Sequence, residues 1–228
     1  DMAQDGLLAV GGNLTPEWLI HAYSKGIFPW FNNDYEQIRW WFPEKRAVMR
    51  PGDMRVSKSL KKFLLNSKLE IKADKNFRKV MELCASTRSM YAGTWITDNM
   101  VSAYTKLHDQ NIAHSIEVYE EGIMIGGLYG ISIGKIFCGE SMFHLKNNAS
   151  KVAFYHLNKH LLKSNYDLID CQFVNNHLLS LGAREIASHD FLKILDKLSL
   201  IHISEPTRPE RIGYSGGWLK KKKGGGGG

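Results

Sequence analysis

The stretch HSIEVYEEGIMIGGLYGISIGKIFCGE, residues 114–140, decides the fold. Apolar residues run through 114–120, 123–133 and 135–140, and tight turns at EEG and at Gly134-Lys135 separate the three runs. Short turns between such runs are typical of β-hairpins, so the stretch predicts three successive strands. A long helix, ASKVAFYHLNKHLLKSN, follows it and leads into a further strand, DLIDCQF.

The segments on either side extend this pattern. LEIKAD is predicted to be a strand, and NFRKVMELCAS and TDNMVSAYTKLHD are predicted to be helices, the second capped by Thr97. A short helix, NNHLLSLG, follows the last strand. This order resembles that of an N-acetyltransferase (GNAT) domain, in which the strand after the long helix splays from its neighbour and opens a slot for the acyl donor.

The N-terminal part of the chain has a different character. Thr15-Pro16 is predicted to begin a helix that ends at Gly26, and GIFPWF and IRWWFP follow as an aromatic loop and a short strand. The expected fold class is therefore α+β, with a small mixed domain at 1–52 and a GNAT-like acyltransferase domain at 53–197.

The last segment, residues 198–228, is set apart from both domains. Its LSLIHISEPTR resembles the in-frame translation of a transposase-end adapter used in sequencing libraries, and LKKKK and GGGGG follow it. We interpret 198–228 as a non-native tail; the alternative is a genuine basic tail. Without it, 24 Lys+Arg and 21 Asp+Glu remain, a net charge of +3, so an interaction with nucleic acid has to be argued from the position of the charges.

The cysteines, the histidines and the length of the apolar runs argue against several classes of protein. Cys84, Cys138 and Cys171 lie far apart without a C-x-x-C pair, which argues against a disulfide framework and a zinc site and favours the cytoplasm. The histidines show no ligand spacing, and no apolar run is long enough to span a membrane. We expect no metal, no membrane association and a monomeric protein.

Three polar residues are candidates for catalysis. Asp170 and Gln172 are two residues apart in the predicted strand, so they are expected to share one face, and Glu140 ends the strand across the slot. Polar groups that converge in an apolar cleft are typical of a substrate site. The alternative is that Asp170 caps the next helix and Gln172 satisfies a backbone group.

Longer motifs resemble a known family over about residues 6–195. GLLAVGGNLTPEWLIHAYSKGIFPWF, WWFPEKRAV, GTWIT, AHSIEVY, GGLYG, FCGESMF, NASK and LIDCQFVNNHLLSLGA resemble, in order and spacing, the leucyl/phenylalanyl-tRNA–protein transferases. Asn13 and Phe42 stand where Asp and Ser are common, and Leu128 where Met occurs. The chain starts at DMAQDG, so the first segment of the family is expected to be missing.

The resemblance implies transfer of Leu or Phe, and less well Met, from aminoacyl-tRNA to the N-terminal Arg or Lys of a protein, which creates a degradation signal (N-degron). No cofactor is expected, because the tRNA end replaces coenzyme A and CGESMFHLKNNAS lacks the glycine-rich pyrophosphate loop. The family's pattern places the terminal adenosine on Trp30 and Trp95. It lines the aminoacyl pocket with Leu128, Phe137, Met142 and Ile169.

The expected catalytic roles differ among the polar residues. We expect Asp170 to hold the side-chain NH₂ of Gln172 and to direct its amide oxygen to the attacking amine. Two roles are open for Gln172: it takes the proton of the amine, or it only orients the amine while a ribose hydroxyl of the tRNA relays the proton. Glu140 is expected to pair with the cationic acceptor. Asn175 is expected to support this site.

The helix SKSLKKFLLN is amphipathic and presents Lys58, Lys61 and Lys62 as a candidate contact for the tRNA acceptor stem or as an ordinary solvated face. Two other functions stay open: a coenzyme A-dependent or peptidyl acyltransferase, and a non-catalytic RNA-binding module.

Overall fold

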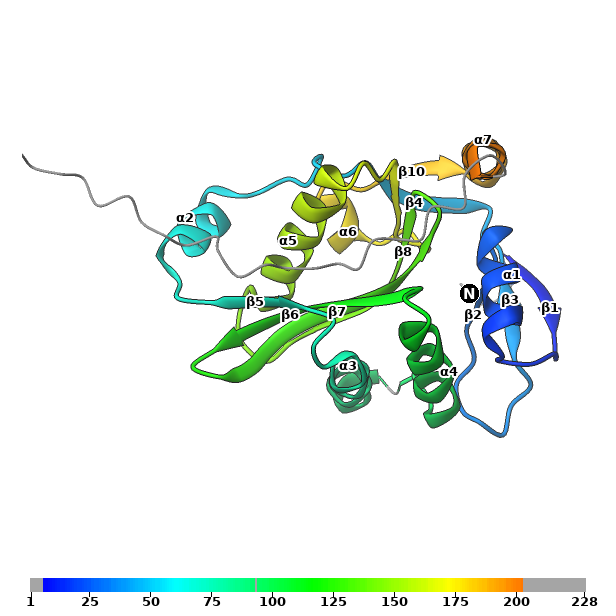
Figure 1. The fold of residues 1–228 in the computed structure, drawn as a ribbon, viewed down its shortest axis with the longest axis horizontal. Helices are drawn as coiled ribbons and strands as arrows, with labels where there is room; N and C mark the ends of the chain where they lie inside the picture. The colour runs from blue at the N-terminus through cyan, green and yellow to red at the C-terminus, as the bar shows by residue number, and fades with distance from the viewer. Residues whose placement is uncertain (1–5, 93, 203–228) are drawn as a thin grey trace, which may run out of the picture.

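The computed structural model describes residues 6–92 and 94–202 and contains two β-sheets. The smaller sheet has the strand order β1-β3-β2, and the larger has the order β10-β4-β9-β8-β7-β6-β5 (Figure 1). The strands are β1 (Leu7–Val10), β2 (Phe28–Pro29), β3 (Arg39–Trp41), β4 (Lys45–Met49), β5 (Glu70–Ala73), β6 (Ala113–Glu120), β7 (Ile123–Ile133), β8 (Ile136–His144), β9 (Leu168–Asp170) and β10 (Arg184–Ala187).

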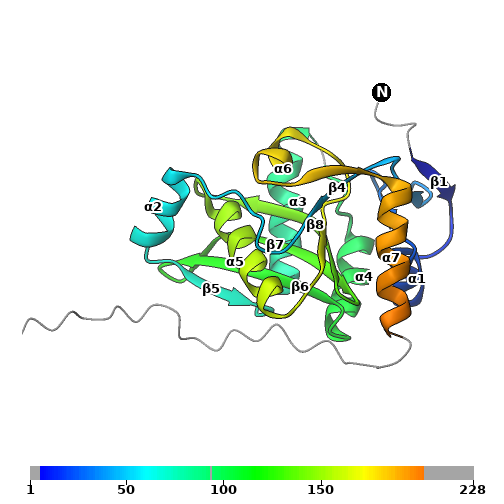
Figure 2. The same cartoon turned by 90° about the horizontal axis from the view of Figure 1, so that it is seen from above.

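The helices cover both faces of the larger sheet. On one face α3 packs against β7 and β8 and α4 against β6, and on the other α5 packs against β6 and β7 (Figures 1 and 2). Helix α1 contacts α4, so the small sheet and its helix adjoin the large sheet on the α4 side. The helices are α1 (Pro16–Ser24), α2 (Lys58–Asn66), α3 (Phe77–Ala92), α4 (Asp98–Asp109), α5 (Ala149–Lys163), α6 (Asn176–Ser180) and α7 (Ser188–His202).

Alternation along the strands divides the apolar residues between two cores. Ile136 and Cys138 of β8 pack in the core under α3 and α4, whereas Phe137 between them packs in the core under α5. Successive side chains of a strand point to opposite faces, so a strand covered on both faces is apolar throughout. Central strands of this kind explain why residues 114–140 carry so strong a strand signal.

The predicted order of elements and the α+β class are confirmed, and this order is the one expected of a GNAT-like domain. Strands β6, β7 and β8 form a continuous antiparallel meander. The N-caps Thr15 and Thr97 accept hydrogen bonds from backbone N–H groups of α1 and α4.

The pairing of β8 with β9 produces the opening that the fold class requires. The two strands are parallel, and their register runs only from Ile136 opposite Leu168 to Cys138 opposite Asp170. Strand β8 continues to His144, whereas β9 ends at Asp170. Beyond that point the strands no longer pair with each other, and a cavity opens between their ends.

The sheet topology corrects one expected boundary. Strand β4 lies within 1–52, yet it pairs with β9 and β10 in the large sheet. Ala47, Val48 and Met49 are almost fully buried there, because β4 is covered on both faces. The two sheets therefore divide between Trp41 and Lys45, before the expected boundary at Gly52. At the other end, α7 continues past Leu198 to His202, and the rest of the expected tail lies outside the described residues.

Candidate active site

A cavity of about 900 Å³ lies at the opening between β8 and β9. Residues from β2 of the small sheet, from β7, β8, β9, α5 and α6, and from the segment after β9 line it. Most of the candidates named from the sequence meet here. They are Glu140, Gln172, Trp30, Trp95, Leu128, Phe137, Met142, Ile169 and Asn175.

One part of the cavity is an apolar pocket. Leu128, Phe137 and Ile169 are almost fully buried in the core under α5, and Met142 packs against them. Phe154 and Leu157 of α5 complete the wall. Apolar side chains such as these bind another apolar side chain by excluding water and discriminate mainly by size.

A second part of the cavity is aromatic. The ring centroids of Trp30 and Phe173 lie 5.2 Å apart, and Trp30 also contacts Trp41 at 5.7 Å. Trp95 lines the same cavity from the segment before α4 and is partly buried. Partly buried indole rings held by neighbouring rings provide surfaces on which a nucleobase can stack.

Glu140 lies in β8 and is held at a bulge. Gly130 pairs with Gly139 and Tyr129 with Ser141, so Glu140 is the extra residue between two paired positions. A Cβ atom at position 130 would lie 2.3 Å from the carbonyl oxygen of Cys138, so the glycine permits this close approach. The bulge lets consecutive residues of β8 line the cavity.

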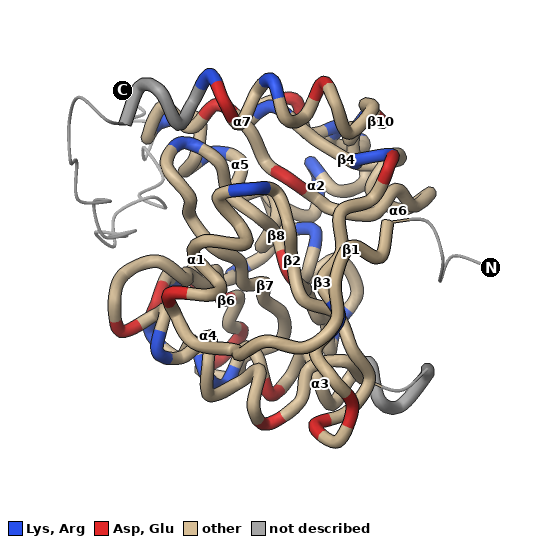
Figure 3. Tube along the Cα trace, turned by 90° about the vertical axis from the view of Figure 1, so that its right-hand side faces the viewer, with Lys and Arg blue, Asp and Glu red and all other residues tan. Residues whose placement is uncertain are grey.

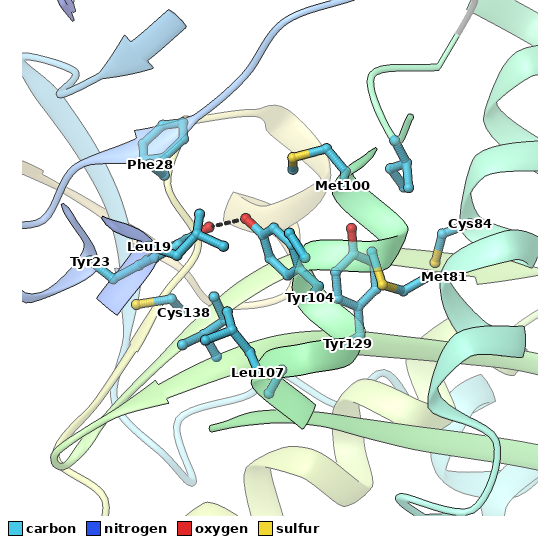
Figure 4. Close-up of a cluster of buried hydrophobic side chains, with 14 of the residues drawn as sticks. Leu19, Tyr23, Phe28, Met81, Cys84, Met100, Tyr104, Leu107, Tyr129 and Cys138 are labelled. Atoms are coloured by element: carbon cyan, nitrogen blue, oxygen red, sulfur yellow. Dashed lines mark hydrogen bonds between the residues drawn. The ribbon is translucent and has the colours of Figure 1, made fainter. Parts of the chain in front are cut away.

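Three donor groups surround the carboxylate of Glu140. The hydroxyl of Tyr23 in α1 donates to Oε1 at 2.6 Å. The hydroxyl of Tyr104 in α4 lies 2.6 Å from that of Tyr23 (Figure 4) and 3.3 Å from Oε2, and its single hydrogen serves one of these two contacts. The side-chain Nε2 of Gln172 is the third donor, to Oε1 at 2.7 Å. Glu140 thereby joins the small sheet's helix, α4 and the end of β9.

Burial changes the acidity of this group. Loss of water around Glu140 is the main cause that raises its pKa from 4.5 to about 7, against the lowering effect of the hydrogen bond from Tyr23. Its carboxyl group therefore exchanges a proton near neutral pH, as a general base or acid requires.

The structure corrects the expected link between Asp170 and Gln172. Strand β9 ends at Asp170, and Gln172 has a φ of +62°, so the two residues do not share a strand face. Asp170 Oδ1 accepts the backbone N–H of Gln172 at 2.9 Å, whereas the side-chain amide turns to Glu140. A carboxylate does fix the amide of Gln172, but it is Glu140.

Asp170 is instead paired with a residue that the sequence did not reveal. Arg46 of β4 donates from Nε to Oδ1 at 2.9 Å and from Nη2 to Oδ2 at 2.7 Å. Arg46 and Asp170 are 1% and 0% exposed, and the guanidinium lies 5.0 Å from the ring centroid of Phe28 and 4.4 Å from that of Phe191. Asp170 therefore anchors the segment before Gln172 and does not itself line the cavity.

The sequence of the chain matches two models of one family. The model described as leucyl/phenylalanyl-tRNA protein transferase matches residues 48–196, and that of the N-terminal domain of the same transferase matches residues 12–44. The chain belongs to this family. The leucyl/phenylalanyl-tRNA–protein transferase of Shewanella piezotolerans is 53% identical over 194 residues, which are 85% of this chain and 82% of that protein. That of Nitrosospira multiformis is 50% identical over 194 residues, 85% and 83% of the two chains.

Solved structures resemble the fold at low sequence identity. FemX aligns with a TM-score of 0.50 and 8% identity over 67% of this chain and 64% of its own. A likeness at this identity concerns the fold alone.

The lysines that were considered for tRNA binding lie outside the cavity of this family member. Lys58, Lys61 and Lys62 are exposed on α2, a helix with no acidic residue. On the face drawn in Figure 3, by contrast, acidic and basic residues are interspersed along α4 and α7. The role of the three lysines stays a prediction. Asn175 has a local task, since its Oδ1 caps α6 by accepting the N–H of Leu178 at 2.9 Å.

Sequence reasoning missed Tyr23, Tyr104, Arg46 and Phe173. Arg46 and Phe173 fall within motifs of the transferase family, WWFPEKRAV and LIDCQFVNNHLLSLGA, but their residue types gave no reason to single them out. The hydroxyl of Tyr23 meets a carboxylate 117 residues away. Nothing local in a helix signals such a contact.

Within the described residues, no group of three or more His, Cys, Asp or Glu could hold a metal ion, and no helix is long and apolar enough to cross a membrane.

Proposed function

We propose that this chain transfers Leu or Phe, and less well Met, from aminoacyl-tRNA to the N-terminal Arg or Lys of acceptor proteins, which marks them for degradation. Membership of the transferase family supports the reaction class. The observation that carries the proposal is that one cavity combines an apolar pocket, partly buried indole rings and the Glu140–Gln172 pair.

The aminoacylated end of the tRNA is proposed to occupy the cavity, with its adenosine in the aromatic part and its amino acid in the apolar part. The terminal adenine stacks on Trp30 and Trp95, because any base presents a π-face and stacking contributes about 1–3 kcal/mol per base. The aminoacyl side chain enters the pocket formed by Leu128, Phe137, Met142 and Ile169. The side chains of these four residues are apolar and discriminate mainly by size, so several apolar amino acids are expected to be accepted.

The chemistry assigned to Gln172 and Glu140 follows from their hydrogen bond. The side-chain NH₂ of Gln172 donates a hydrogen bond to Glu140, which fixes the orientation of the amide. The amide oxygen can then accept an N–H of the attacking α-amine. A carboxylate has about four lone-pair sites, and three donors reach Glu140, which leaves a site on Oε2 for the proton of the amine. Positioning and proton removal are the two tasks that an activated ester leaves to the enzyme.

The proposed reaction conserves atoms and charge. The amine nitrogen attacks the carbonyl carbon of the aminoacyl ester, and a proton passes from nitrogen to Glu140. The ester C–O bond breaks, the peptide C–N bond forms, and the ribose oxygen takes up the proton from Glu140. The glutamate returns to its starting state without a covalent intermediate or a cofactor.

The tRNA body and the acceptor protein beyond its N-terminal residue are bound outside the cavity. Lys58, Lys61 and Lys62 offer clustered positive charge to the phosphates of the acceptor stem. The negative charge of Glu140 also favours a cationic N-terminal residue. We propose that the enzyme works as a monomer in the cytoplasm.

The test is transfer of labelled leucine from Leu-tRNA to a peptide that begins with Arg, with the same peptide beginning with Ala as the control. We expect label in the Arg peptide only. Acetyl-CoA is offered to the same enzyme in parallel. Acetylation by acetyl-CoA without transfer from Leu-tRNA would assign the cavity to a coenzyme A-dependent acyltransferase instead.

A further inference from the structure

The side chain of Ser141 stands out among the buried polar groups of β8. It follows Glu140 directly, is 8% exposed and lines the cavity. Within the part of the chain that the structure describes, its Oγ has no hydrogen-bond partner. A buried hydroxyl without a partner costs about 1–3 kcal/mol, so such a group in a native protein calls for an explanation.

Other buried serines of the same sheet are hydrogen-bonded within the protein. Ser115 in β6 is 1% exposed, and its Oγ donates to Glu117 at 3.1 Å. Ser132 in β7 is 5% exposed, and the hydroxyl of Tyr166 donates to its Oγ at 3.0 Å. Neither of them lines the cavity. The unpartnered hydroxyl thus coincides with the place where a substrate can supply the partner.

Two acceptor groups that line the same cavity indicate what that partner has to be. Gln172 contributes an amide oxygen and Glu140 a carboxylate, and both accept hydrogen bonds. The hydroxyls of Tyr23 and Tyr104 are already bonded to Glu140 and to each other. These groups serve the N–H groups of an amine, whereas the oxygen of the ester carbonyl needs a donor. Ser141 is a donor that the internal network leaves unused.

We propose that Ser141 Oγ donates a hydrogen bond to the carbonyl oxygen of the aminoacyl ester and stabilises the negative charge that forms there. This inference rests on the proposed function. When the amine attacks, the carbonyl π-electrons move to the oxygen, and they return when the C–O bond to ribose breaks. Ser141 keeps its proton throughout and only strengthens its hydrogen bond as the charge develops.

The bulge in β8 gives this assignment a structural basis. A regular strand would point Glu140 and Ser141 to opposite faces. Because Glu140 is the extra residue between the pairs Gly130–Gly139 and Tyr129–Ser141, both line one cavity. The two residues can therefore act on adjacent atoms of one substrate, the amine nitrogen and the carbonyl oxygen.

The experiment compares Ser141→Ala with Ser132→Ala, a matched buried serine outside the cavity. For Ser141→Ala we expect kcat for transfer from Leu-tRNA to fall about 10²-fold, the loss typical of one such donor, with KM for Leu-tRNA unchanged. Its melting temperature without substrate should equal or exceed that of the unmodified protein, because an unpartnered hydroxyl is removed. Ser132→Ala should melt at a lower temperature and keep its kcat.

Several results would overturn the assignment. A lower melting temperature for Ser141→Ala would mean that the hydroxyl has an internal partner. A raised KM with unchanged kcat would mean that it binds an atom that does not change charge in the reaction, such as a ribose hydroxyl. Unchanged kinetics of Ser141→Ala beside an active unmodified enzyme would refute this role alone, whereas an inactive unmodified enzyme would refute the proposed function and this role with it.

Discussion

Glu117 and Glu140 are buried carboxylates of the same sheet, 0% and 9% exposed, but their surroundings differ. Glu117 accepts four hydrogen bonds: Oε1 from the backbone N–H groups of Lys75 and Asn76 at 2.9 and 2.6 Å and from Ser115 at 3.1 Å, and Oε2 from Tyr119 at 2.8 Å. Three of these donors meet at Oε1, and two of the three are backbone N–H groups. Glu117 thereby fixes the turn that leads from β5 into α3.

Glu140 differs in what lies beside it. Three donor groups surround its carboxylate, its side chain lines the cavity, and the next residue, Ser141, has a buried hydroxyl with no partner among the described residues. A buried carboxylate that is held away from the cavity stabilises the fold, whereas one that lines the cavity is available to a substrate.

The largest effect is expected for Asp170→Asn, which removes one partner of the buried ion pair with Arg46. Breaking such a pair leaves an uncompensated charge and costs about 3–5 kcal/mol of the free energy of unfolding. Urea denaturation measures it. The control is Glu185→Gln, which breaks the exposed pair with Lys45 on neighbouring strands and should cost less than about 1 kcal/mol. Similar losses in both variants would remove Asp170 from its anchoring role.

Glu140→Gln tests the carboxylate that lines the cavity directly. The substitution keeps the shape of the side chain but removes the proton acceptor, so kcat/KM for transfer should fall about 10³-fold, or about 4 kcal/mol. Initial rates with Leu-tRNA and an Arg peptide measure it at a temperature where the variant is folded. A loss below tenfold would show that Glu140 does not take the proton.

The raised pKa of Glu140 makes stability depend on pH. The folded protein holds the proton of Glu140 with a pKa of about 7, against 4.5 as the ordinary value. Its stabilising contribution is therefore complete below about pH 4.5 and is lost as the pH rises through 7, a change of about 3 kcal/mol. The free energy of unfolding, compared between the unmodified protein and Glu140→Gln from pH 4.5 to 7.5, should shift by this amount in favour of the variant. If the free energies of unfolding of the two proteins change in parallel over this pH range, Glu140 does not have the raised pKa.

Glu117→Gln makes the same change as Glu140→Gln at the buried carboxylate outside the cavity, and it should have the smallest of these effects. It weakens charge-assisted hydrogen bonds to two backbone N–H groups, so the free energy of unfolding should fall by about 2–3 kcal/mol. The kcat/KM of the folded fraction should stay unchanged, because Glu117 does not line the cavity. A loss of activity comparable to that of Glu140→Gln would erase the distinction between the two regions.

The sequence predicted much of the fold and the location of the site because both depend on local patterns. Residues 114–140 predicted the meander from short turns between apolar runs, and Thr15 and Thr97 predicted the starts of two helices. It also named Glu140 and Gln172, which line the cavity, together with residues of its apolar wall. These predictions held because a strand covered on both faces has to be apolar, and because an N-cap interacts with its own helix.

The tertiary structure decided which polar groups meet. From the alternation of side chains along a strand, Asp170 was predicted to hold the amide of Gln172. In the structure β9 ends at Asp170, and the positive φ of Gln172 turns its amide toward Glu140, 32 residues away. The partner of Asp170 is Arg46, 124 residues away. Hydrogen bonds over such separations depend on the order of strands in the sheet, since β4 pairs with β9 although the two strands are far apart in the sequence. The sequence alone thus determined the elements and the candidates, whereas the sheet topology determined their partners, because a polar side chain pairs with whatever group the fold buries next to it.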